Sequence, residues 1–254
     1  MPFSKDDVGK MRWEFARVTD KHLELLSGYL GRNYDNGRAK EFATHGFMRR
    51  IKILTRCIQN VFGILPLERI SIPNMDELSD AAINIQAFVF NVFGCVDNLA
   101  WVWVLEKHVV KTNGAELNQN QVGLRVGNTR VRESFSSEFQ AYLAGLDDWF
   151  AYQENYRHAL AHRIPLYIPQ YNVHPDNEVA HQSLGEQATA ALNRLDTTEY
   201  NRLSAEQEAL GTFSPQMTHS FSEALGVVFF HPQLLADFAT VHELGQKMLI
   251  ELNR

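Results

Sequence analysis

Apolar residues recur every three or four positions along much of the chain, which is the spacing of an amphipathic helix. This pattern predicts a first helix over residues 7–30 and a second over residues 38–63. A polar run that contains Gly31 and Gly37 separates the two. The first quarter of the chain is therefore expected to form a pair of helices with one apolar face each.

The third predicted helix is the most apolar one. It begins at Asn74 or Asp76, either of which suits the N-cap position, and runs to about Lys107. The stretch 81–105 is long enough to cross a membrane, but its polar residues would be costly in lipid. These residues are Asp97 and the amides Asn84, Gln86, Asn91 and Asn98. We expect a central buried helix and no association with a membrane.

The second half of the chain continues the helical pattern with interruptions. Residues 112–131 are rich in Gly, Asn and Gln and are expected to form a loop with a short extended piece. A fourth helix is predicted at about 133–163, and Pro165 stops it. Residues 215–253 are again helical in pattern, and Pro232 is expected to split or kink them.

The predicted fold class is all-α, because no sustained alternation of apolar and polar residues indicates strands. Residues 1–170 are expected to form a helical bundle. A polar, partly irregular connector is expected at 171–213, with some helix near 198–210. Residues 214–254 are expected to add C-terminal helices that pack on the bundle.

Composition and charge change this picture little. The chain has 254 residues, 45% of them hydrophobic, and a net charge of −6, which argues against a general nucleic-acid binder. The charge is uneven, since residues 1–60 carry 12 basic and 7 acidic side chains, a net of +5. A local basic surface is therefore possible. Cys57 and Cys95 lie in apolar helical patterns and are expected to be free buried thiols in a cytoplasmic protein.

The densest chemistry lies at the end of the fourth predicted helix, where two arginines and two histidines precede Pro165. Glu154, His158 and His162 step by four and share one helix face. Arg157 and His162 are five residues apart, which is about 140° around a regular helix. They can act together where the helix end unwinds, or across the two-fold axis of a dimer.

This pair of residue types suits metal-free cleavage of RNA. An arginine holds a phosphate with two hydrogen bonds and stays charged, while a histidine exchanges protons near neutral pH. The histidine would activate the 2′-OH for attack on the adjacent phosphate, and the arginine would stabilise the developing charge.

Arg157-x4-His162 before Ile164-Pro165 resembles the Arg-x4–6-His motif of the HEPN superfamily of helical-bundle proteins. The resemblance covers about residues 75–170, and His158 stands where many members have Asn or Asp. It implies a homodimer whose two motifs share a cleft, and a metal-independent ribonuclease or RNA-binding protein. It also implies a defence or toxin–antitoxin setting, with an antitoxin or another protein as partner.

The resemblance also suggests roles for individual residues. Arg157 would hold the phosphate, His162 would be the general acid and base, and His158 would transfer or orient a proton. Asp97, which needs a partner if it is buried, would orient Arg157 or the histidine. No cofactor or metal is required. Six further cations are candidate contacts for the RNA backbone: Arg49, Lys52, Arg56, Arg125, Arg130 and Arg163.

Two other interpretations remain open at this point. Glu154, His158 and His162 have the spacing of metal ligands on a helix in a bundle metalloprotein. Alternatively, the chain is a non-catalytic dimerisation or interaction module. The cations near Pro165 would then only satisfy the last carbonyl groups of their helix, and those near Arg49 would form a solvated face.

Overall fold

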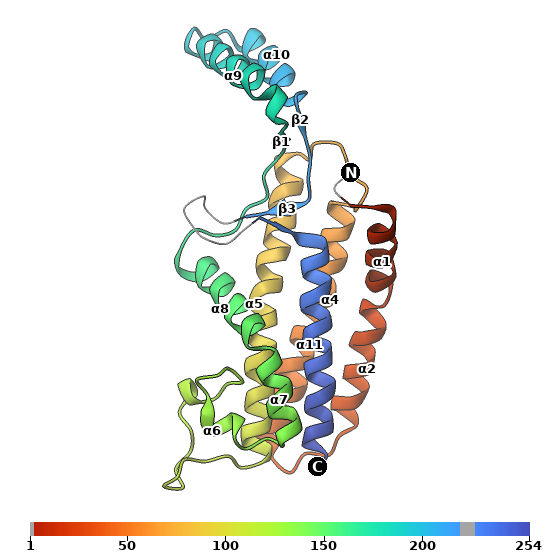
Figure 1. Cartoon of the computed structure of the whole chain (residues 1–254), viewed down its shortest axis with the longest axis vertical. Coiled ribbons are helices and arrows are strands. Elements are labelled where there is room, and N and C mark those ends of the chain that lie inside the picture. The colour runs from red at the N-terminus through yellow and green to blue at the C-terminus, as the bar shows by residue number, and fades with distance from the viewer. Residues whose placement is uncertain (1–2, 219–226) are drawn as a thin grey trace.

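Helices dominate the computed structural model of the chain, which describes residues 3–218 and 227–254. They form an elongated bundle, and a pair of helices projects from one end of it (Figure 1). The strands in the described residues are two antiparallel pairs of two residues each. The chain is therefore an all-α helical bundle, as the sequence predicts.

The N-terminal segment forms two helices where the pattern predicts one. α1 spans Lys5–Ala16 and α2 spans Val18–Gly31, and the chain turns between them at Arg17. Ser4 caps α1 in a capping box, because its hydroxyl accepts from the amide of Asp7 while the Asp7 carboxylate accepts from the amide of Ser4. The prediction of one helix over 7–30 is wrong at Arg17, because apolar spacing continues through the turn and gives no sign of it.

The second predicted helix is one continuous rod with a local defect. α3 (Gly37–Glu41) leads into a π-helical segment, η1 (Phe42–Phe47), and this leads into α4 (Met48–Ile64). Asn36 caps its beginning by accepting hydrogen bonds from two backbone amides. The wider π turn rotates the side chains that precede α4 relative to those that follow it.

α5 (Met75–Glu106) is the central helix, capped by Asn74 together with Glu77. It contacts α3, η1, α4, α8 and α11 (Figure 1). The helix is long and apolar enough to cross a membrane, but 61% of its most apolar window is buried inside the protein. Such burial is typical of a core helix in a helical bundle.

The segment after α5 is a loop with short elements, η2 (Gln119–Gln121) and α6 (Thr129–Arg132), and with one extended bridge. The helix predicted at 133–163 is wrong as a single element, because it is two helices, α7 (Ser137–Gly145) and α8 (Asp147–His162). Ser136 caps α7, and two aspartates in the first turn of α8 favour a new helix start there.

A helical hairpin projects beyond the bundle. β1 (Asn172–Val173) pairs with β2 (Gly211–Thr212), and η3 (Pro175–Asn177), α9 (Glu178–Asn193) and α10 (Thr197–Glu208) lie between them. α9 and α10 bury their own small apolar cluster of Ala188, Ala191 and Leu203. The segment is more helical than its pattern suggests, because so few apolar positions suffice to join two short helices.

The C-terminal segment returns to the bundle. β3 (Gln216–Met217) pairs with β4 (Val228–Phe229), and α11 (Phe230–Leu252) packs against α2, α4 and α5. Pro232 neither splits nor kinks this helix, because it lies in the first turn, where the missing N–H has no partner to lose. The helix pattern predicted from residue 215 is wrong at Gln216–Met217, and its part over 219–226 lies outside the described residues.

Candidate functional site

α8 is fixed to the bundle by one buried face. Phe150, Gln153, Tyr156 and Ala159 are buried on it. The indole of Trp149 donates a hydrogen bond of 2.9 Å to the carboxylate of Asp237 on α11, and burial raises the pKa of that carboxyl. Glu154, His158 and His162 lie away from this face, whereas Arg157, one turn after Gln153, lies on it and contacts α5.

Arg157 lies on the ring of Phe93, a residue of α5. Its guanidinium carbon is 4.4 Å from the ring centroid, a cation–π contact. The side chain is half-buried, and its Nε is buried without a hydrogen-bond partner among the described residues. One terminal nitrogen is 3.5 Å from Nε2 of His158. The guanidinium is thus held in place by a neutral surface and keeps hydrogen-bonding capacity.

Asp97 lies one turn after Phe93 on α5 and is half-buried. Burial raises the pKa of its carboxyl, and the nearby guanidiniums of Arg125, Arg157 and Arg50 act against that rise. Within residues 3–218 and 227–254, no direct hydrogen bond or ion pair of Asp97 is present. The expected pairing of Asp97 with Arg157 is therefore one of charges at longer range, because Phe93 takes the direct contact.

Arg125 joins this cluster from the loop after α5. It forms an ion pair with Glu154, and its guanidinium lies 5.5 Å from the Phe93 ring centroid. Glu154 also lies 3.9 Å from Nε2 of His158. We name Asp97, Arg125, Glu154, Arg157, His158 and His162 the α5/α8 cluster. It combines guanidinium groups, which bind phosphates, with carboxyl and imidazole groups, which transfer protons.

The two histidines at the end of α8 are exposed neighbours. The ring centroids of His158 and His162 are 5.8 Å apart. α8 stays helical to His162, and the backbone becomes extended only at Arg163. Unwinding before His162 does not occur, so Arg157 and His162 keep their angular separation within one chain.

The metal site that the spacing of Glu154, His158 and His162 suggested is not formed by the described residues. In residues 3–218 and 227–254, no three His, Cys, Asp or Glu side chains converge as metal ligands. Glu154 is engaged by Arg125 instead.

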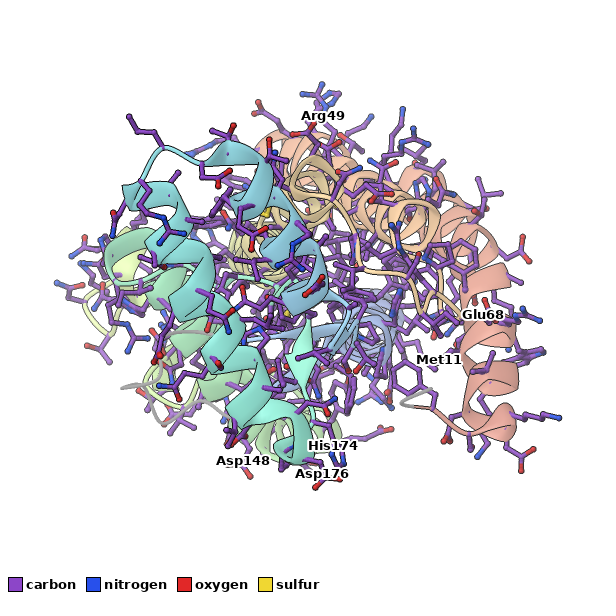
Figure 2. The ribbon with its side chains drawn as sticks, turned by 90° about the horizontal axis from the view of Figure 1, so that it is seen from above. Met11, Arg49, Glu68, Asp148, His174 and Asp176 are labelled. Atoms are coloured by element: carbon purple, nitrogen blue, oxygen red, sulfur yellow. The ribbon has the colours of Figure 1, made fainter. Side chains whose placement is uncertain are left out.

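The remaining predicted RNA contacts are dispersed. Arg163 donates to the backbone oxygen of Asn155 at 2.9 Å and to its side-chain Oδ1 at 2.5 Å, so it is engaged by its own helix. Arg130 donates to the carbonyl of Val110 at 2.8 Å. Arg49, Lys52 and Arg56 are exposed on α4. Seen from above, Arg49 and Asp148 of α8 lie on opposite sides of the molecule (Figure 2).

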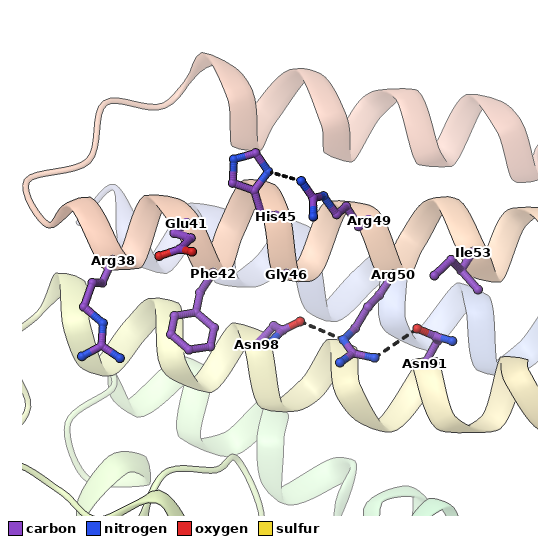
Figure 3. A pocket seen from close by; sticks show the side chains of 10 residues that line it. All are labelled: Arg38, Glu41, Phe42, His45, Gly46, Arg49, Arg50, Ile53, Asn91 and Asn98. Carbon is purple, nitrogen blue, oxygen red and sulfur yellow. Dashed lines mark hydrogen bonds between the residues drawn. The ribbon is translucent and has the colours of Figure 1, made fainter.

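A groove that the sequence did not reveal lies between the α3–η1–α4 rod and α5. Two adjoining cavities of about 610 Å³ and 480 Å³ form it and share Arg38, Phe42, Arg50 and Asn98 in their linings. Arg50 donates 3.0 Å hydrogen bonds to the side-chain oxygens of Asn91 and Asn98 (Figure 3). The second cavity also reaches Asp97 of the α5/α8 cluster.

A signal for this groove was present in the sequence. Asn91 and Asn98 are seven residues apart and therefore lie on one face of an otherwise apolar helix. Buried amides need polar partners, which here come from the guanidinium of Arg50. Identifying Arg50 as that partner requires the register of α4 against α5, which spacing alone does not supply.

No protein-family model matches the chain, and neither a curated protein nor a solved structure matches it. The fold and the two neighbouring polar sites are what characterise the chain.

Proposed function

We propose that the chain is a HEPN-like RNA-cleaving protein of the cytoplasm, a metal-independent endoribonuclease that uses the α5/α8 cluster. The observation that carries the proposal is the state of Arg157. Its guanidinium is fixed on Phe93 and forms no ion pair among the described residues. An arginine so placed can receive a phosphate without first breaking a salt bridge.

The proposed chemistry is a transesterification at phosphorus, assisted by proton transfers and needing no metal. His162 accepts the proton of the 2′-OH, whose oxygen attacks the adjacent phosphorus, while Arg157 stabilises the charge on the phosphoryl oxygens. The bond from phosphorus to the 5′-oxygen breaks, and a protonated histidine gives that oxygen a proton. The products are a 2′,3′-cyclic phosphate and a free 5′-OH. His158, next to His162, is the candidate for the second proton transfer.

Asp97 would act as a positioning residue in this mechanism. Its carboxyl is half-buried beside the guanidiniums of Arg125 and Arg157. A negative charge there favours the approach of both cations to α5. Because the contact is not direct, Asp97 would tune the position of Arg157 without sharing in phosphate binding.

A homodimer would bring Arg157 of one chain and His162 of another to one cleft. This part of the proposal rests on the regular geometry of α8 up to His162. It is also supported by an outward apolar stripe on α5, where Ile83 is 63% exposed and Phe90 is 42% exposed. These two residues are seven apart, on the same face as Asp97. A second copy could cover that stripe.

The test is cleavage of single-stranded RNA by the full chain in the presence of a chelator. We expect Arg157→Ala and His162→Ala to lose cleavage by roughly 10²-fold or more, the contribution typical of general acid–base catalysis. His174→Ala is the matched control, because His174 is an exposed histidine on a different element, beside Asp176 (Figure 2). Its rate should equal that of the natural chain.

Thermal melting of each variant shows whether a lost rate reflects the site or the fold. His162 is exposed, so its removal should leave the melting temperature nearly unchanged. Equal cleavage by all four proteins would refute the assignment of the site. Absence of cleavage by the natural chain on all RNAs tried would favour the non-catalytic interaction module.

A further inference from the structure

The groove between the α3–η1–α4 rod and α5 is a basic cavity with few acids. Arg38, Arg49 and Arg50 line it, and Glu41 is the carboxylate in the lining of its larger part. Among residues 3–218 and 227–254, none of these three arginines forms an ion pair, and Asp97 is the carboxylate in the lining of the smaller part. The groove therefore offers guanidinium groups to an anion from outside the chain.

Arg50 is prepared for this role by its neighbours. Two neutral amide oxygens, at 3.0 Å each, fix its orientation without neutralising its charge. Its guanidinium lies flat on α5 at Gly94, where an added Cβ would stand 2.4 Å from the guanidinium carbon. Asn98 is packed in the same way against Gly46 of the π-helix, where a Cβ would stand 2.9 Å from its amide carbon. Such fixed groups lose little freedom on binding.

An aromatic surface adjoins these cations. Phe42 and Trp101 stack at 5.5 Å between ring centroids and 13° between planes, and both rings are half-buried. Both residues line the smaller cavity together with Arg38 and Arg50. Phe42 is the first residue of the π-helix, so the defect in the rod helps to place its ring over α5. A planar base could stack at this surface while its phosphate meets the guanidiniums.

We propose that this groove binds a nucleoside phosphate, with Arg50 and Arg38 on the phosphate and the Phe42/Trp101 surface on the base. The inference rests on the proposed function in one respect: Asp97 of the α5/α8 cluster also lines the smaller cavity, so a strand held there would lie next to that cluster. A nucleotide within a strand and a free nucleotide both present a phosphate and a base, so both fit this proposal. The experiment below separates these sources.

The test measures equilibrium binding by the full chain at one fixed, near-physiological salt concentration. The probes are a short single-stranded DNA, adenosine 5′-monophosphate and inorganic phosphate. DNA lacks the 2′-OH and cannot be cleaved by the proposed route, so binding is measured apart from catalysis. If the chain fails to cleave RNA, the binding measurement still tests the groove. If the groove fails to bind nucleotides, the cleavage measurement still tests the α5/α8 cluster.

Arg50→Gln is the main variant, and Lys40→Gln on α3 of the same rod is its matched control. Lys40 is exposed and does not line the groove. Because Arg50 also joins α4 to α5, Arg38→Gln at the exposed rim is the second variant, and its fold should be unaffected. We expect each groove variant to weaken binding about tenfold or more, as loss of a charged hydrogen bond does. Lys40→Gln should change it less than about twofold.

Each outcome decides the proposal. Groove-dependent binding of DNA alone identifies a strand as the ligand, and groove-dependent binding of the mononucleotide identifies a free nucleotide; either supports it. Absence of binding by both probes overturns it. An equal loss of binding in Lys40→Gln also overturns it, because that would indicate binding to a diffuse basic surface. Inorganic phosphate bound as tightly as the mononucleotide overturns it too, because the base would then contribute nothing to binding.

Discussion

At the scale of single residues, the groups that each arginine contacts indicate whether its role is structural or chemical. Arg163 and Arg132 donate to carbonyl groups of the chain itself, and Arg132 also pairs with Asp147. Arg157 and Arg50 instead rest on a ring and on two amides. The first kind stabilises helix ends and loops, whereas the second kind keeps a positive charge available to a ligand.

The sequence predicted the candidates at this scale, but not their neighbours. Arg157, His158 and His162 follow from local spacing on one helix. Phe93 as the support of Arg157 depends on how α8 is placed along α5, and that is set by packing between segments more than 60 positions apart. Arg163 was predicted to contact RNA, and its hydrogen bonds to Asn155 became visible only in three dimensions.

A buried histidine gives a prediction for stability against pH. His231 is fully buried, its Nε2 lies 2.7 Å from the carbonyl oxygen of Leu65, and burial lowers its pKa to about 4. Protonation therefore favours the unfolded chain, where the pKa is near 6.5. Stability from this group is present above pH 6.5 and is lost as the pH falls from 6.5 to 4, by about 3 kcal/mol at most.

Denaturant unfolding at several pH values checks this prediction. His231→Gln keeps an N–H that can donate to the Leu65 carbonyl but does not titrate in this range. The decline in unfolding free energy between pH 6.5 and 4 should be smaller in His231→Gln than in the natural chain. Parallel pH profiles of the two proteins would show that His231 is not the group responsible.

At the scale of elements, apolar periodicity found the helices but missed their interruptions. α5 was predicted almost to its ends, because Asn74 is a good cap and its apolar run is long. The breaks at Arg17 and Leu146 leave that periodicity nearly intact. The π-helix at Phe42–Phe47 adds one residue to a turn, and this changes which side chains face α5 without changing composition.

The outward stripe of α5 predicts self-association. Phe90→Asp should place a charge on this stripe and convert a dimer of the 29.1 kDa chain into a monomer. Light scattering of the purified protein measures the mass directly. Ile70→Asp is the control, because Ile70 is 72% exposed but lies outside α5. A natural chain that is monomeric at micromolar concentration would refute the dimer.

At the scale of the whole molecule, the bundle and the projecting hairpin have separate apolar cores. The main core joins α1, α2, α4, α5 and α11, whereas α9 and α10 bury residues against each other. The sequence predicted the bundle because it has many buried positions in regular steps. It did not predict the hairpin's two full helices, because their cluster is small and their other positions are polar.

Removal of the hairpin should therefore leave the bundle folded. Val173 and Gly211 are partners in the antiparallel β1–β2 pair, so residues 174–210 can be replaced by Asn-Gly. We expect one cooperative thermal transition and a melting temperature within about 4 °C of that of the natural chain. A broad transition, or loss of helical circular dichroism beyond the removed segment, would show that the hairpin supports the bundle.

The central claim is that the α5/α8 cluster cleaves RNA by attack of the 2′-OH, and the ends of the products test it most directly. The natural chain, with a chelator present, should convert single-stranded RNA into fragments with 2′,3′-cyclic phosphate and 5′-OH ends. The same strand with one 2′-deoxy position should remain intact at that position. Fragments with 5′-phosphate ends, or cleavage at the 2′-deoxy position, would contradict the mechanism proposed for Arg157 and His162.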